Sequence, residues 1–126
     1  MRANNIYISF LTIILFVPIL HVIMSSCSNR HAYPEELDVL DTLCKDSAEV
    51  AMRRIGALAD KYGKRGQNEY DYNYYLLLKI KAANNAYKPL TDSTVFRVLD
   101  FFKNAGDKNK LCQSYYYLGK ILCKQE

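Results

Sequence analysis

Four cysteine thiols and two histidine imidazoles are the side chains of this 126-residue chain with the greatest capacity for covalent or metal chemistry. His21 lies inside an apolar N-terminal stretch, and His31 follows ten residues later. No Cys and His spacing suits a zinc site, no histidine stands in a nucleophile–base arrangement, and no glycine-rich phosphate loop is present. The sequence therefore predicts that the chain is not an enzyme and takes no metal, cofactor or small-molecule substrate.

Cys27 is the thiol with the most informative surroundings. It follows Met24, Ser25 and Ser26, at the end of a long stretch that contains no Asp, Glu, Lys or Arg. Arg2 and the amine of the chain place a short positive segment before that apolar stretch. This order of charges, apolar residues and small residues is typical of a segment that directs a chain out of the cytoplasm.

The segment Met24–Cys27 resembles the bacterial lipobox, in which an apolar residue and two small residues precede an obligatory cysteine. The resemblance implies a signal peptide over residues 1–26, cleavage before Cys27, a diacylglycerol thioether on its sulfur and an acyl chain on its new amine. One acyl chain anchors a protein only reversibly, whereas two signals hold it stably. Cys27 is therefore expected to attach the protein to a membrane, with residues 27–33 as a tether.

An uncleaved transmembrane helix is the alternative for the same segment. A span needs about 20 apolar residues, and Ile6–Met24 supplies 19. Pro18 and His21 interrupt that stretch, so the sequence favours the lipoprotein while the span stays open. The expected location is the cell envelope, facing the periplasm, with the outer membrane favoured over the inner one.

Charge is distributed unevenly after the apolar segment. Six acids and one lysine lie between positions 34 and 49, whereas fourteen basic and seven acidic residues lie between positions 50 and 126. The basic residues never form a run longer than two and recur at helical intervals. Solvated helix faces are therefore predicted, and no nucleic-acid partner is expected.

The region over 34–126 has the periodicity of an all-α module. A first helix is predicted to begin at Pro34, a second to be opened by a capping pair of Asp46 and Glu49 and to end near Tyr62, and a third to cover Glu69–Tyr87 before Pro89. A fourth helix is predicted after Thr91 or Asp92, and a fifth after a left-handed Gly106 and a capping Asp107. The predicted apolar stripes are Leu37, Leu40 and Leu43; Tyr72, Leu76, Ile80, Ala83 and Tyr87; Val95, Val98, Leu99 and Phe102; and Leu111, Tyr115, Leu118 and Leu122, with Cys112, Tyr116, Gly119 and Cys123 beside the last.

Tyr115, Leu118, Gly119 and Leu122 resemble, in order and spacing, the opening helix of a tetratricopeptide repeat. The resemblance implies antiparallel helix hairpins that form a fragment of an α-solenoid, with Gly119 letting a neighbouring helix approach closely. The face from Tyr115 to Leu122 is expected either to be exposed or to dock onto the third and fourth helices. An earlier, degenerate repeat can be aligned at Tyr74, 41 residues before Tyr115.

Three thiols remain once Cys27 is lipidated. Cys112 and Cys123 lie eleven residues apart, about 16 Å along one helix, and a disulfide needs Cα atoms within about 7 Å. These two therefore cannot pair within one chain, while Cys44 with either remains open. Buried free cysteines are the expectation.

Consecutive tyrosines must point to different faces of a helix. Tyr72, Tyr75 and Tyr116 are therefore candidates for a surface that binds a protein or peptide, because tyrosine is enriched at interfaces. Core packing is the alternative for most of the eleven tyrosines.

A membrane-anchored adaptor or sensor that binds an unidentified protein or peptide is the function that these patterns favour. The layout is similar to that of lipid-anchored helical-repeat proteins of Gram-negative gut anaerobes, in the leader and in the segments Pro34–Leu37 and Leu40–Leu43. Two alternatives remain: the N-terminal remnant of a longer repeat regulator, and a structural envelope lipoprotein held by an uncleaved transmembrane helix.

Overall fold

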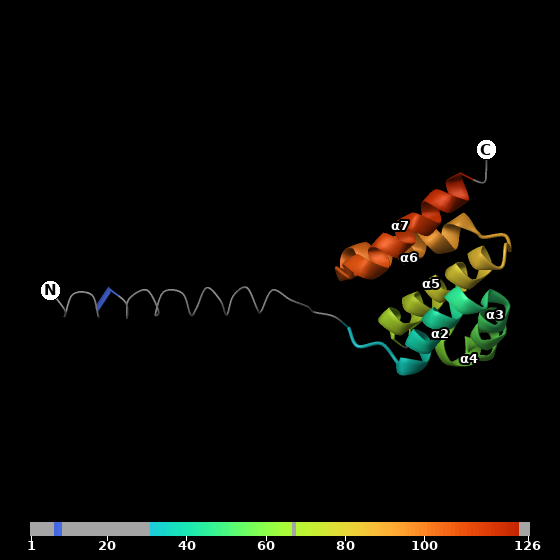
Figure 1. Cartoon of the computed structure of the whole chain (residues 1–126), viewed down its shortest axis with the longest axis horizontal. Helices are drawn as coiled ribbons and strands as arrows, with labels where there is room; N and C mark the ends of the chain where they lie inside the picture. Colours follow the sequence, from blue (N-terminus) through green and yellow to red (C-terminus); the bar gives the residue numbers. More distant parts are fainter. Residues whose placement is uncertain (1–6, 9–30, 67, 124–126) are drawn as a thin grey trace. The chain divides into compact units, whose positions relative to one another are not determined.

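The computed structural model describes residues 7–8, 31–66 and 68–123, and the part of the chain that it describes contains helices and no strand. The all-α prediction is confirmed. Residues 1–30 and 31–126 form separate units, and the helical module is the second of them. Its helices follow one another through short connections (Figure 1): α2 (Glu35–Asp46), α3 (Ala48–Ala57), α4 (Ala59–Tyr62), α5 (Glu69–Asn85), α6 (Asp92–Ala105) and α7 (Lys108–Leu122).

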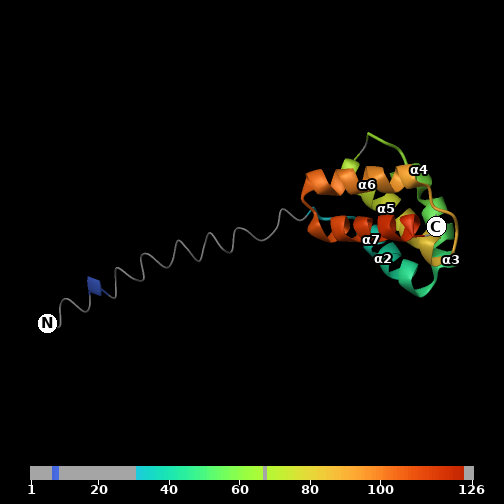
Figure 2. The same cartoon turned by 90° about the horizontal axis from the view of Figure 1, so that it is seen from above.

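The helices pack mainly against their neighbours in chain order. Helix α5 lies between two groups, with α2, α3 and α4 on one side and α6 and α7 on the other (Figures 1 and 2). Among the described residues, no Cα atom of α2 comes within 8 Å of a Cα atom of α7. Helix α5 is therefore the element that joins the two groups.

Burial extends around most of the circumference of α5. Tyr74, Leu77 and Leu78 on this helix are at most 1% exposed, and the polar Asn73 and Lys81 are also buried. A one-sided stripe through Leu76 and Ile80 was the expectation from the sequence. The predicted stripe is too narrow, because α2, α3, α4, α6 and α7 all contact α5 and leave little of its surface in solvent. A helix at the edge of a module keeps one face in solvent.

Local signals set several helix ends as predicted. Gly106 ends α6 in the left-handed conformation with φ 74°, and the Asp107 carboxylate accepts a hydrogen bond from the backbone N–H of Lys110 at 3.1 Å. Helix α5 also begins with a cap that was not predicted: Asn68 Oδ1 accepts hydrogen bonds from the backbone N–H groups of Tyr70 and Asp71.

The predicted capping pair of the second helix is wrong. Asp46 is the last residue of α2, and Ser47 precedes α3 without a capping hydrogen bond from its side chain. The helix predicted to reach Tyr62 is also divided at Leu58, although its end before Gly63 is confirmed. A carboxylate inside the last turn of one helix cannot also serve as the extended cap of the next.

The third helix ends two residues earlier than predicted. Tyr87 has φ 56°, and the backbone N–H of Lys88 donates to the carbonyl of Ala83 at 2.8 Å, which closes the end of α5. This is the left-handed ending that glycine usually provides. The Tyr87 side chain is 90% exposed, so its place in the predicted inward stripe is wrong.

No helix within residues 31–66 and 68–123 has the length and hydropathy needed to cross a membrane. The predicted signal peptide, the lipobox residues Met24, Ser25 and Ser26, and the lipidation site Cys27 all lie outside the described residues.

Candidate functional site

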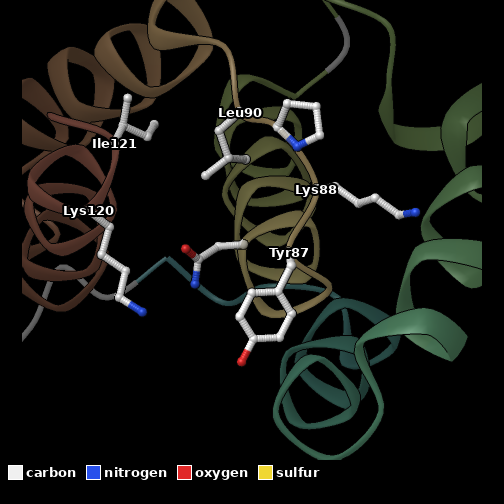
Figure 3. A pocket seen from close by; sticks show the side chains of 7 residues that line it. Tyr87, Lys88, Leu90, Lys120 and Ile121 are labelled. Carbon is white, nitrogen blue, oxygen red and sulfur yellow. The ribbon is translucent and has the colours of Figure 1, made fainter. Parts of the chain in front are cut away.

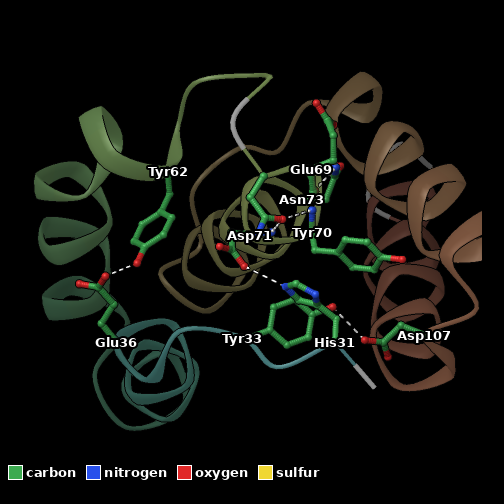
Figure 4. A network of polar contacts seen from close by, with 10 residues as sticks. His31, Tyr33, Glu36, Tyr62, Glu69, Tyr70, Asp71, Asn73 and Asp107 are labelled. Atoms are coloured by element: carbon green, nitrogen blue, oxygen red, sulfur yellow. Dashed lines mark hydrogen bonds and ion pairs between the residues drawn. The ribbon is translucent and has the colours of Figure 1, made fainter. Parts of the chain in front are cut away.

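The first residues of the module are bound to it by their side chains (Figure 4). The ring of His31 stacks on that of Tyr70 with centroids 4.4 Å apart, and His31 Nε2 lies 3.3 Å from a carboxylate oxygen of Asp71. Tyr33 donates a hydrogen bond to Asp107 at 2.9 Å. Residues 31–33, which the sequence assigned to a tether, therefore belong to the packed module.

Lys110 lies against two of the aromatic rings near this end of the module. Its ammonium is 3.8 Å from the ring centroid of Tyr74 and 5.0 Å from that of Tyr33. Burial lowers the pKa of Lys110, and nearby Asp41 and Asp107 oppose that effect. A cation held over aromatic faces is attracted by their quadrupoles, so Lys110 links α7 to α5 and to the segment before α2.

Two acids of α2 bind groups of α5. Tyr74 donates to Asp38 at 3.1 Å, and Lys81 forms an ion pair with Asp41 in which the two side chains are only 7% and 20% exposed. Burial, Asp41 and Asp38 together raise the pKa of the Tyr74 phenol. These polar side chains are occupied by one another, so the arrangement holds helices together and leaves no free acid–base pair among them.

Glu36 ties α2 to the short helix α4. Its carboxylate accepts a hydrogen bond from Tyr62 (Figure 4) and another from Lys61. These bonds lower the pKa of Glu36. The contact fixes the chain that connects α3 to α5 against the start of α2. Its role is again structural.

A hollow opens between the α5–α6 connection and α7 (Figure 3). Tyr87, Lys88 and Leu90 line it from the connection, and Lys120 and Ile121 line it from α7. Both lysines and the tyrosine are exposed to solvent. The polar groups of this hollow are therefore two amines and a phenol in contact with solvent, together with the amide of Asn84.

Two of the three tyrosines predicted to form a binding surface belong to the core. Tyr72 is 8% exposed and receives a hydrogen bond from Arg97, and Tyr75 is 4% exposed and donates to the carbonyl of Ile55. That part of the prediction is wrong because α5 is enclosed. Tyr116, on α7, is 57% exposed and remains available.

Helix α7 buries one side against the module and exposes the other. Ser114, Tyr117 and Ile121 face the module and are at most 6% exposed. Of the four repeat-like residues, Leu118 packs partly against the core, and the other three are exposed, in agreement with the exposed alternative: Tyr115, Gly119 and Leu122. A Cβ added at Gly119 would meet nothing within 4 Å, so the close helix approach expected at this glycine is not made within the module.

The three described cysteines are free, but only one is buried as expected. Cys44 donates its S–H to the carbonyl of Leu78, and burial raises the pKa of its thiol to about 11. Cys112 and Cys123 are exposed on α7. Within the described residues there is no cluster of three His, Cys, Asp or Glu side chains that could hold a metal ion.

The chain matches no protein-family model, no curated protein and no solved structure. The likeness to tetratricopeptide repeats and to lipoproteins therefore depends on the residues of this chain alone. The docking of His31 and Tyr33 is not predicted by the sequence patterns above, and the only signal for it was two aromatic rings close to the start of the first helix.

Proposed function

We propose that this protein is a membrane-anchored lipoprotein, attached through Cys27, whose helical module binds a protein or peptide. The observation that carries the binding role is the outward side of α7, where Tyr115, Tyr116 and Leu122 are each about half exposed. Large apolar side chains that gather on one exposed face commonly mark an interaction site.

The order of helix contacts supports a helical-repeat architecture. In a solenoid each unit contacts only its neighbours in the chain. Here α2 packs with α3, α5 packs with α6, and α7 packs on α5 and α6, whereas no Cα atom of α7 lies within 8 Å of a Cα atom of α2. Two helix pairs followed by the opening helix of a third would have this pattern, and it agrees with the alignment of Tyr74 in α5 with Tyr115 in α7.

The position of Cys27 supports a short anchor. Four residue steps separate it from His31, whose side chain already contacts the module. An extended chain spans at most about 3.5 Å per residue, so a lipid on Cys27 would hold the module within about 14 Å of its attachment point. Such a tether presents the module directly beside the membrane surface.

The anchor is tested by labelling with a radioactive or clickable fatty acid in the native cells. Cys27→Ala is expected to lose the label and to keep its leader, because it removes both the acylated sulfur and the cleavage signal. Cys112→Ala is the matched control, since it removes an exposed cysteine elsewhere, and it should keep the label. Unchanged labelling of Cys27→Ala would falsify the anchor.

The binding surface is tested by placing a photoreactive amino acid at position 116 of the full-length chain in intact cells. A cross-linked species of one defined mass is expected from this position. Phe96, which is half exposed on α6, is the control position and should give none. Cross-linking from both positions, or from neither, would contradict a specific surface on α7.

A second candidate function follows from the same exposed side of α7. The second helix of a repeat pair would pack there, as in a longer repeat regulator of which this chain would be the N-terminal part. A repeat pattern continuing in the DNA after the codon for Glu126 would support that role. A downstream sequence without helical repeats would remove it.

A further inference from the structure

We propose that the outward side of α7 binds the same side of a second copy of this chain. The two helices run antiparallel, and Cys112 of each copy lies opposite Cys123 of the other. This inference identifies the partner of the surface described above. The pairing itself is independent of the lipid anchor, whereas its oxidation in the cell rests on the proposed location outside the cytoplasm.

Four uncharged residues form a narrow line along the exposed side of α7: Cys112, Tyr116, Gly119 and Cys123. At about 100° per residue, these positions fall within about 60° of one another around the helix. The buried residues Tyr117 and Ile121 lie on the opposite side. The line is therefore directed straight away from the module, where a second helix can reach it without disturbing the fold.

The spacing of this line is symmetric about the midpoint between Tyr117 and Leu118. When two copies of α7 pair antiparallel about that midpoint, Cys112 meets Cys123 and Tyr116 meets Gly119, each twice. A two-fold interface requires a surface that is complementary to itself. The order Cys, Tyr, Gly, Cys at intervals of four, three and four residues has that property.

Gly119 provides the space that such a pairing needs. Nothing lies within 4 Å of a Cβ built at this position, and a shallow hollow there is bordered by Tyr115, Tyr116, Lys120 and Cys123. Tyr116 is 57% exposed and large enough to fill the hollow of the second copy. A small residue facing a large one is the pattern by which helix surfaces interdigitate.

No charged side chain interrupts this line on α7. The line itself carries no charge, and Lys120 beside it holds its ammonium 5.2 Å from the ring centroid of Tyr116 in its own chain. Antiparallel helices also place opposite ends of their dipoles together.

The distances between facing positions suit a disulfide. Packed helices have axes about 8–10 Å apart and Cα atoms about 2.3 Å from each axis, which leaves facing Cα atoms about 3.5–5.5 Å apart. Disulfides usually join Cα atoms about 4.4–6.8 Å apart. Both bonds form together when the helices cross at the shallow angle of about 20° found in many helix pairs.

Formation of each bond is a two-electron oxidation. The thiols of Cys112 and of Cys123 in the second copy lose their protons, a sulfur–sulfur bond forms, and two electrons pass to a disulfide oxidant such as oxidised glutathione, which is reduced to two thiols. Both cysteines are exposed and can meet a second copy, whereas Cys44 is buried within the folded module. Stable interfaces bury about 800 Å² on each partner, which is more than one helix face offers. The two disulfides would stabilise the pair despite this small buried area.

The test uses the full-length chain in detergent, treated with oxidised glutathione and analysed without reductant. A dimer is expected, with peptide mapping that joins the segment of Cys112 to that of Cys123. Cys112→Ala and Cys123→Ala should each lose the dimer, because like cysteines lie about 16 Å apart along the pair. Mixing the two variants should restore a dimer with one bond.

Gly119→Leu fills the hollow and should reduce the yield of covalent dimer at least tenfold. Gly56→Leu is the matched control, since Gly56 is also an exposed helical glycine with nothing within 4 Å of its Cβ position, and it should leave the yield unchanged. Links between Cys112 and Cys112, no restoration on mixing, or equal effects of the two leucines would overturn the proposal. Loss of lipid on Cys27→Ala bears on the anchor alone, because this pairing is measured without a membrane.

Discussion

Helices α5 and α7 are both rich in tyrosine, yet one is enclosed and the other is half solvated. In α5, Tyr72, Tyr74 and Tyr75 are at most 8% exposed. In α7, Tyr117 is buried, whereas Tyr115 and Tyr116 are more than half exposed. The difference comes from position in the fold, because α5 contacts helices on both sides and α7 contacts them on one.

The comparison separates two uses of the same side chain. A tyrosine in α5 adds buried area and directs its hydroxyl to a partner within the module, as Tyr75 does with the carbonyl of Ile55. A tyrosine on the outer side of α7 contributes little to folding and keeps its area for a second molecule. Changes in α5 should therefore alter stability, and changes on the outer side of α7 should alter association.

The largest expected contrast is in thiol reactivity. Cys44 is buried against α5, so a reagent reaches its thiol only when the module opens. It should react with a maleimide at pH 7.5 about a thousandfold more slowly than the exposed Cys112 on α7. Mass spectrometry of each cysteine peptide measures both rates. In denaturant the two rates should become similar, and a native ratio below tenfold would contradict the burial of Cys44.

Truncation of matched leucines should give the next largest contrast. Leu77→Ala in α5 removes a fully buried side chain and should lower the free energy of unfolding by about 2–5 kcal/mol. Leu122→Ala in α7, where the leucine is 49% exposed, should change it by about 0.5 kcal/mol or less. Chemical denaturation measures both, and similar losses would show that α7 is enclosed as α5 is.

Breaking a buried and an exposed ion pair should give a smaller difference in the free energy of unfolding. Asp41→Asn leaves the buried ammonium of Lys81 without its carboxylate and should lower the free energy of unfolding by about 2 kcal/mol, somewhat less than for a fully enclosed pair. Asp60→Asn breaks the solvated pair with Lys64 and should have no measurable effect. Denaturation in low and high salt tests this, since the loss for Asp41→Asn should persist in salt.

The smallest expected effect is on the pH dependence of the free energy of unfolding. The pKa of Tyr74 is raised above its usual value near 10, so the folded state holds this proton more tightly than the unfolded state. Its contribution is complete below about pH 10 and is lost as the pH rises through the folded-state pKa. Tyr74→Phe should cost about 1 kcal/mol at pH 8, through the lost hydrogen bond to Asp38, and should weaken the fall in stability above pH 10.

Tyr116→Phe is the control for that experiment, because its ring is exposed and its hydroxyl supports no helix contact in the module. Unfolding curves at pH 8 and pH 10.5 should coincide with those of the unchanged chain. An equal change of slope in both variants would remove the special role of Tyr74.

Local chemistry allowed most helix limits to be predicted. The glycine and aspartate at 106 and 107 act within a few residues of their own position, and the structure places them as the sequence indicated. The prediction failed at Ser47, which precedes α3 without a capping hydrogen bond from its side chain, and at Tyr87, which stands where glycine usually ends a helix. There the surrounding packing outweighs a local preference that is worth about 1 kcal/mol.

The sequence by itself determined that the module is helical and that the lines of Leu, Val and Tyr recur along its helices, because hydrogen bonding and periodicity act over a few residues. The tertiary structure decided which lines are buried: it enclosed α5, directed Cys112, Tyr116, Gly119 and Cys123 outward, and drew His31 and Tyr33 onto the module. Burial depends on which elements meet in space, and residues far apart in the chain decide that together.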